Sequence, residues 1–105
     1  MPDVTSILSA AQCRAARAMV DWTPERLSQA SAIDLQTIRN FEARFRRPDE
    51  RTLRRIRVAL EHAGVAFIPE NGQGAGVRFK FNSREVRAIK RWEAEGGMTG
   101  NDAIY

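Results

Sequence analysis

The stretch LSQASAIDLQTIRNFE, residues 27–42, constrains the fold more than any other part of this sequence. Its apolar residues recur at helical spacing, stop for the three letters AID, and then resume at once. The Thr-Pro pair at 23–24 can start a helix, because Thr caps free backbone donors and Pro tolerates the first helical position. Asp34 is a second capping residue. The pattern therefore predicts one short helix ending near Ser31 and another over 35–44.

Helices are also predicted on both sides of this stretch. Residues 6–20 are rich in Ala and other good helix formers. Two strips follow the helical period there: Leu8, Ala11, Ala15 and Met19, and beside them Cys13, Ala16 and Val20. After the third helix, Pro48 breaks the pattern, Asp49 can cap a fourth helix, and Gly64 is a natural stop.

Two short helices joined by a tight turn form a helix-turn-helix. In that motif the second helix protrudes to enter a DNA major groove, while the first braces it across the backbone. We expect Leu27 and Ala30 to pack against Ile38 and Phe41, with Ile33 inserted from the turn into the core. This packing leaves five residues of the second helix facing outward: Leu35, Gln36, Thr37, Arg39 and Asn40.

The character of the sequence changes at residue 65. VAFIP and VRFKF flank the glycine-rich ENGQGAG, which predicts a β-hairpin. In its second strand, 77–81, apolar and basic residues alternate. Residues 83–95 are expected to form a final helix. We therefore divide the chain into a DNA-binding domain (1–64), an extension (65–97) made of the hairpin and the final helix, and a loose tail (98–105).

The positive charge is clustered. The formal net charge is +4 and the sequence pI is about 10.2. Between residues 39 and 57 lie Arg39, Arg44, Arg46, Arg47, Arg51, Arg54, Arg55 and Arg57, opposed by Glu42, Asp49 and Glu50. Clustered Arg suits a polyanion, because its planar fork of donors matches phosphate. A solvated helix face with a bias towards Arg is the simpler alternative.

Other chemistry has little support in the sequence. The composition is that of an ordinary globular protein, no apolar run approaches membrane-spanning length, and the single cysteine, Cys13, is best interpreted as a core residue. We expect a cytoplasmic protein. His62 stands alone without a metal-ligand pattern, and GQGAG precedes a strand and lacks the Lys-Ser/Thr ending of a phosphate-binding loop. We expect no enzyme, cofactor or metal.

LSQASAIDLQTIRNFE followed by RRP resembles the Cro/repressor (XRE) helix-turn-helix family, over about residues 10–64. The resemblance implies a mainly α fold, a lambda-repressor-like bundle of four helices, here followed by the hairpin and a C-terminal helix. It also implies a structural ion pair between Arg17 and Glu42. Two positions depart from the family pattern: Ala32 replaces the usual turn glycine, and Pro24 stands where a phosphate-binding Gln is common.

The function that we expect is that of a sequence-specific DNA-binding transcriptional regulator. Gln36 and Asn40 can bond adenine and Arg39 guanine, while Thr37 or Leu35 can contact a thymine methyl group. The expected phosphate contacts are Thr23, Arg44, Arg46 and Arg47.

A homodimeric repressor on a near-palindromic double-stranded operator is the expected assembly. Its expected dimer contacts are Val77, Phe79, Phe81, Val86, Ile89 and Trp92. Two alternatives stay open: these residues cap their own helical core in a monomer, or residues 65–105 hold a protein partner, as in an antitoxin or anti-activator. The sequence names neither the operator, the regulated genes nor any effector.

Overall fold

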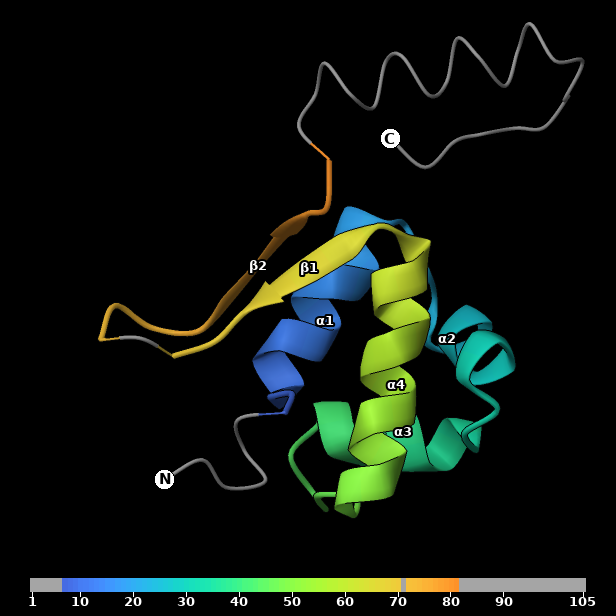
Figure 1. Cartoon of the computed structure of the whole chain (residues 1–105). Coiled ribbons are helices and arrows are strands. Elements are labelled where there is room, and N and C mark those ends of the chain that lie inside the picture. The colour runs from blue at the N-terminus through green and yellow to red at the C-terminus, as the bar shows by residue number, and fades with distance from the viewer. Residues whose placement is uncertain (1–6, 71, 82–105) are drawn as a thin grey trace, which may run out of the picture.

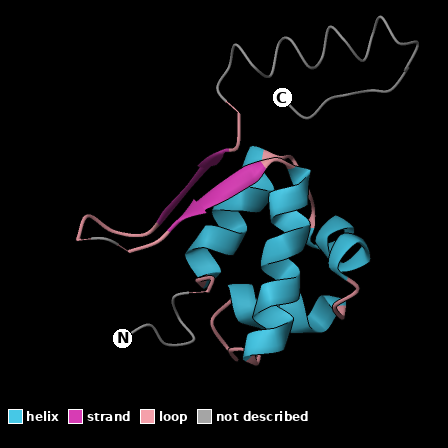
Figure 2. Cartoon of the chain, viewed as in Figure 1, coloured by secondary structure: helices cyan, strands magenta, loops and turns pink. Residues whose placement is uncertain are grey.

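The computed structural model describes residues 7–70 and 72–81, which form four helices and a two-stranded antiparallel hairpin (Figure 1). In chain order the elements are α1 (Ala10–Met19), α2 (Pro24–Ser31), α3 (Leu35–Glu42), α4 (Glu50–Ala63), β1 (Val65–Ile68) and β2 (Gly76–Phe79). This part of the chain is mainly helical, as predicted (Figure 2). The predicted final helix, 83–95, and the tail, 98–105, lie outside the described residues.

Three helices begin at the capping residues that the sequence indicated. The Thr23 hydroxyl accepts a hydrogen bond from the backbone of Arg26 at 3.0 Å, and a carboxylate oxygen of Asp34 accepts one from Gln36 at 3.0 Å. Asp49 caps α4 in the same way. Each cap satisfies a backbone donor that has no partner inside the helix and contributes about 1 kcal/mol.

The first helix starts later than predicted. Ser9 and Gln12 form a reciprocal capping box: the Ser9 hydroxyl accepts from the Gln12 backbone, and Gln12 Oε1 accepts from the Ser9 backbone, both at 3.0 Å. The helix therefore begins at Ala10 and not at residue 6. The Ser-x-x-Gln pattern is present in the sequence, so this start is predictable in principle.

One hydrophobic core joins all four helices and the hairpin. Its largest fully buried side chains include Phe41, Leu8, Leu27, Ile38, Leu53, Ile56, Leu60, Val20, Val65 and Cys13. Val65 and Phe67 belong to this cluster. The boundary predicted at residue 64 therefore does not separate two packed units.

One packing prediction was wrong, and of the two periodic strips on α1 only one is fully buried. Of the two strips on α1, Cys13, Ala16 and Val20 are buried, whereas Ala11 and Ala15 are exposed. On α2 the residue buried beside Leu27 is Ser31, while Ala30 is exposed. Periodicity alone could not separate these faces, because alanines and serines lie on both sides of each short helix.

The hairpin lies across α1 and α4 (Figure 1). Val65 pairs with Phe79 and Phe67 with Val77, so these four side chains share the face that meets the helices. Gln12 also links α1 to β2, because its side-chain amide donates a hydrogen bond to the backbone oxygen of Gly76 at 2.9 Å.

The second strand is shorter than predicted and ends at Phe79. Beyond it, the backbone N–H of Lys80 donates to the carbonyl of Gly64 at 2.7 Å. Phe81 is exposed. The described chain therefore leaves the hairpin next to the C-terminal end of α4.

Candidate nucleic-acid interface

The turn between α2 and α3 holds the two helices as a compact unit. Ala32 ends α2 with φ 61° and ψ 30°, the left-handed conformation expected at the position of the usual turn glycine. Two serines satisfy the backbone around it. The Ser28 hydroxyl donates to the carbonyl of Ile33 at 2.6 Å, and the Ser31 hydroxyl donates to Leu27 at 2.7 Å and accepts from the Ile33 backbone at 3.2 Å.

These serine bonds are a feature that the sequence prediction missed. Ser31 is buried, although its residue type favours a helix surface. The sequence did contain a signal for these hydrogen bonds, because a Ser within one turn of a helix end can bond nearby backbone groups. The hydrogen bonds of Ser28 and Ser31 stabilise the turn and so offset the strain of a non-glycine residue at Ala32.

The outward face of α3 is the one that the sequence predicted. Ile38, Phe41 and Glu42 are buried against the rest of the domain. The five predicted base-reading residues are exposed or half-buried: Gln36 and Arg39 are exposed, and Leu35, Thr37 and Asn40 are half-buried. Gln36, Arg39 and Asn40 thus lie opposite the buried side of α3, and Leu35 and Thr37 lie at the two edges of this outward face.

Two amides on this face are already paired with each other. Gln36 Nε2 donates to Asn40 Oδ1 at 3.0 Å, one helical turn away. This bond uses one of the two N–H donors of Gln36 Nε2 and one lone pair of Asn40 Oδ1. Gln36 Oε1 and Asn40 Nδ2 take no part in it, so the pair can still present an acceptor and a donor to the major-groove edge of adenine.

The predicted guanine reader, Arg39, contacts α2. Its Nη2 lies 2.6 Å from Glu25 Oε2, and both side chains are about half exposed, at 51% and 55%. Hydrogen bonding to its own backbone N–H, followed by the charge of Arg39, keeps the pKa of Glu25 below its usual range. An ion pair this exposed contributes little to stability, so Arg39 can exchange Glu25 for a stronger partner.

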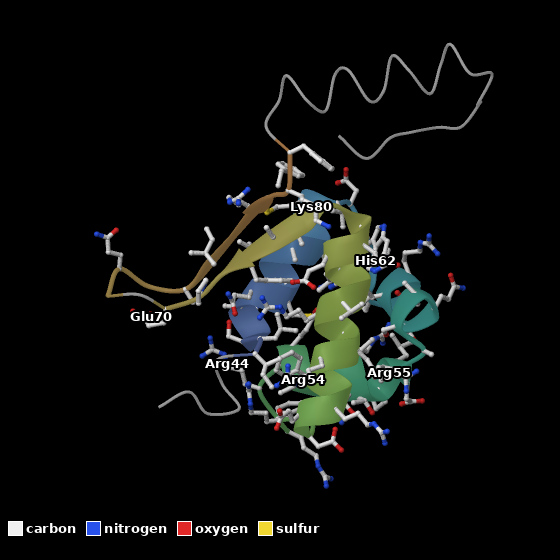
Figure 3. The ribbon with its side chains drawn as sticks, in the orientation of Figure 1. Arg44, Arg54, Arg55, His62, Glu70 and Lys80 are labelled. Carbon is white, nitrogen blue, oxygen red and sulfur yellow. The ribbon has the colours of Figure 1, made fainter. Side chains whose placement is uncertain are left out.

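An arginine-rich loop, residues 43–49, follows α3. Arg44 has φ 65°, and two backbone bonds of the Schellman type close the helix: Arg44 to Phe41 at 3.0 Å, and Phe45 to Asn40 at 2.8 Å. Arg44 is exposed (Figure 3). Phe45 is 81% exposed, although the residue at that position often packs back on its helix. The sequence alone did not single out Phe45.

The remaining predicted phosphate contacts differ in their surroundings. Arg46 is exposed and lines a small recess with Thr37, Asn40 and Pro48, so it lies beside the outward face of α3. Arg47 donates to the carbonyl of Leu8 at 2.9 Å and stacks over the ring of Phe41. Arg47 is therefore held against the domain in this structure.

Thr23 lies at the start of α2 and is exposed. Its hydroxyl oxygen already accepts the capping bond from Arg26. The hydroxyl also hydrogen bonds the Glu25 carboxylate, so the predicted neutral phosphate contact requires the Thr23 hydroxyl to exchange Glu25 for phosphate.

The predicted ion pair of Arg17 and Glu42 is present. Arg17 Nη2 lies 2.6 Å from Glu42 Oε1 and Nε lies 2.8 Å from Oε2, with side-chain exposures of 18% and 8%. This two-point contact joins α1 to the end of α3. The hydrogen bond to Glu42 raises the pKa of Arg17 above its ordinary value.

Two neighbours complete the surroundings of Glu42. The Cys13 thiol donates to Oε2 at 3.0 Å, and Arg14 donates to the Glu42 carbonyl at 2.6 Å. Burial is the largest cause that raises the pKa of Cys13, followed by its bond to Glu42. A thiol in this state is a structural group and a poor nucleophile.

The predicted dimer contacts fall in two groups. Val77 packs on the chain's own core, Phe79 is half-buried and Phe81 is exposed. Val86, Ile89 and Trp92 lie outside the described residues. The contact of these residues with a second copy stays a prediction.

A scan against protein-family models and a search of curated proteins found no match to this chain. Within residues 7–70 and 72–81, no group of three or more His, Cys, Asp and Glu residues is arranged to hold a metal, and no helix is long and apolar enough to cross a membrane. His62 is exposed on α4. The face of α3 and its arginine loop are thus the best-developed candidate site in this part of the chain.

Proposed function

We propose that this chain is a sequence-specific DNA-binding transcriptional regulator of the Cro/repressor type. The observation that best supports this proposal is the arrangement of α2 and α3. A tight turn joins two short helices, one face of α3 is buried, and the opposite face presents amide, hydroxyl and guanidinium groups. Hydrogen-bonding side chains on one face of a short exposed helix are what direct readout of the major groove requires.

The surroundings of α3 support the proposal. Exposed Arg44 and Arg46 follow it directly, and the start of α2, where Thr23 lies, carries backbone donors that have no partner inside the helix. Phosphate contacts on either side of a reading helix fix its register in the groove. The lambda-repressor-like arrangement of the four helices is part of this proposal.

In the proposed complex, the amide pair reads one or two base pairs. The Gln36–Asn40 bond either stays and presents a joint acceptor and donor, or opens so that each amide bonds adenine in bidentate fashion. Arg39 leaves the exposed Glu25 and bonds guanine. Leu35 and Thr37 supply apolar contacts to thymine methyl groups.

The test begins with selection of bound sequences from a pool of randomised duplexes. Gln36→Ala and Asn40→Ala should each relax the preference at one or two positions of the selected site, at about 1–3 kcal/mol per base pair. The matched control is Gln29→Ala, which removes the same amide from an exposed position on α2. It should leave the preference unchanged.

If no sequence is enriched from the pool, the proposed function fails. If a site is enriched but both α3 variants keep its full preference, α3 is not the reading helix. Failure to enrich any site would favour the protein-binding role, as an antitoxin or anti-activator.

A further inference from the structure

A groove of about 690 Å³ runs between α2 and α4, away from the outward face of α3. Its apolar lining comes from Trp22 and Ala30 on one side and Val58, Ala59 and Ala63 on the other. Val58, which lines this groove, has an exposed fraction of 49%, a high value for an aliphatic side chain. Trp22 and Ala63 pack partly on the core, Ala59 is buried, and Arg26 lies over the Trp22 ring, so the apolar surface that stays open in the groove comes mainly from Ala30 and Val58.

The rim of the groove is strongly basic. Arg26, Arg51, Arg54 and Arg55 line it, with His62 near one end, and none of the described residues that line it is acidic. Arg55 and His62 lie along the side of α4 that faces α2 (Figure 3). Arg54 bonds Glu50 within α4, but that pair is mostly exposed and weak. A segment that is both acidic and apolar would complement this groove.

The chain itself carries a segment of this kind. Residues 93–105, EAEGGMTGNDAIY, contain Glu93, Glu95 and Asp102, no Lys or Arg, and the apolar Met98, Ile104 and Tyr105. We name residues 93–105 the acidic segment. It lies outside the described residues. Its charge and its apolar side chains complement the arginine rim and the apolar floor of the groove.

The path of the chain also favours this occupant. Lys80 is hydrogen bonded to Gly64, the residue directly after Ala63 at the end of the groove. The described chain thus leaves the domain beside one end of the groove. From Arg51 to Ala63 the groove follows about 18 Å of helix. Residues 82–92 span ~16 Å as part of the helix predicted over 83–95 and up to ~36 Å when extended, so they bring the acidic segment at least to the near end of the groove.

We propose that the acidic segment docks into the groove between α2 and α4 of its own chain. Attachment at the end of α4 gives the segment a high effective concentration at the groove, so modest contacts suffice to hold it there. The second copy of the chain and an acidic partner protein are the competing occupants. This proposal concerns a face other than the DNA-reading one and does not depend on DNA binding.

The test uses disulfide formation in the full-length chain. Val58→Cys places a thiol in the groove, and Ala103→Cys places one in the acidic segment. The matched control combines Ala103→Cys with Ala11→Cys, an exposed position on α1, which does not line the groove. The buried native Cys13, whose thiol pKa is raised by burial, does not compete.

In dilute protein under a mild oxidant, the groove pair should close within one chain at least about tenfold faster than the control pair. Non-reducing gels and thiol counts give the rate and separate closure within a chain from linkage between two chains. Raising the salt concentration should slow closure, because the contacts are exposed charges. Equal rates for the two pairs would overturn the proposal, and so would linkage mainly between chains.

A second variant tests the charge basis. In the groove-pair background, Glu93→Gln, Glu95→Gln and Asp102→Asn together should reduce the closure rate to that of the control. These substitutions lie outside the described core, so an unchanged thermal transition verifies the fold. A closure rate that stays high in the neutral variant would show that charge complementarity does not select this occupant, and the proposal would fail.

Discussion

At Glu42, a single carboxylate joins three parts of the fold. It lies in the last turn of α3, accepts two hydrogen bonds from Arg17 on α1, and accepts a third from Cys13. Arg17 in turn donates to the carbonyl of Trp22, in the segment before α2. Removing one charge from such a buried pair leaves the other without compensation. Glu42 therefore holds α3 in place together with the buried Ile38 and Phe41.

Glu42→Gln should lower the free energy of unfolding by about 3–5 kcal/mol, because it leaves the mostly buried Arg17 guanidinium without its counter-charge. Urea unfolding measures the change. The matched control is Arg54→Gln, which breaks the exposed ion pair with Glu50 and should cost less than about 1 kcal/mol. Similar costs for the two variants would contradict the structural role given to Glu42.

The loop arginines allow a second prediction at the residue scale. Replacing both Arg44 and Arg46 by Ala should weaken binding to specific and non-specific DNA alike. It should also reduce the salt slope by about two, because each arginine that neutralises a phosphate releases about one counterion. The control is Arg78→Ala on the hairpin, also exposed, which should leave the slope unchanged. An unaltered slope in the double variant would move the phosphate surface elsewhere.

Arg47 differs from Arg44 and Arg46, because its side chain contacts the rest of the domain. Its guanidinium donates to Leu8 and stacks on Phe41 in the structure, so Arg47→Ala should also lower stability. Thermal unfolding of the free protein separates that loss from any loss of DNA affinity. An Arg47→Ala protein that melts like the parent would show that these contacts contribute nothing measurable.

At the scale of elements, the turn between α2 and α3 is strained at one residue. Ala32 adopts left-handed backbone angles, which cost an L-residue about 1–2 kcal/mol. Its side chain is exposed, so removing the methyl group sacrifices little packing. Ala32→Gly should therefore stabilise the protein by up to about 1 kcal/mol.

The control is the same substitution two residues earlier. Ala30 is also exposed but lies within α2, where Gly is destabilising by about 0.5–1 kcal/mol relative to Ala. Denaturant unfolding should therefore give changes of opposite sign for the two variants. Loss of stability in Ala32→Gly would contradict the strain assigned to Ala32.

The same elements show what the sequence can predict. Thr23, Asp34 and Asp49 marked their helix starts, because a cap is a local interaction between residues two or three apart. The outward face of α3 followed from its strong apolar period. Its buried apolar residues are large and its exposed ones polar, so the two sides were easy to tell apart.

Other features depend on contacts that no local pattern encodes. The pairing of Arg39 with Glu25 needs the angle between α2 and α3, and the tie from Arg47 to Leu8 needs the whole fold. Ala30 was misplaced because small residues carry a weak periodic signal. The exposure of Phe45 contradicts its hydrophobicity, which is why sequence reasoning passed over it.

At the scale of the whole molecule, the hairpin is both part of the core and the candidate link to a second copy. Val65 and Phe67 are buried in the same cluster as the helices, and Val77 packs against it. A chain cut at Gly64 would therefore open the core. The apolar surface that remains for a partner comes from Phe81 and the exposed part of Phe79, together with the helix predicted over 83–95.

That remaining surface leads to the last prediction, a homodimer. One reading helix contacts only a few base pairs, so a regulator of this type needs two, set ~34 Å apart on a near-palindromic site. The edge of β2 can pair with a second copy, and Val86, Ile89 and Trp92 can cover the joined sheet. Light scattering should give a dimer for the full chain and a monomer for a version ending at Phe81, which keeps every buried residue of the described core. A full chain that stays monomeric at concentrations where it binds its operator tightly, without pairing on the DNA, would contradict this assembly.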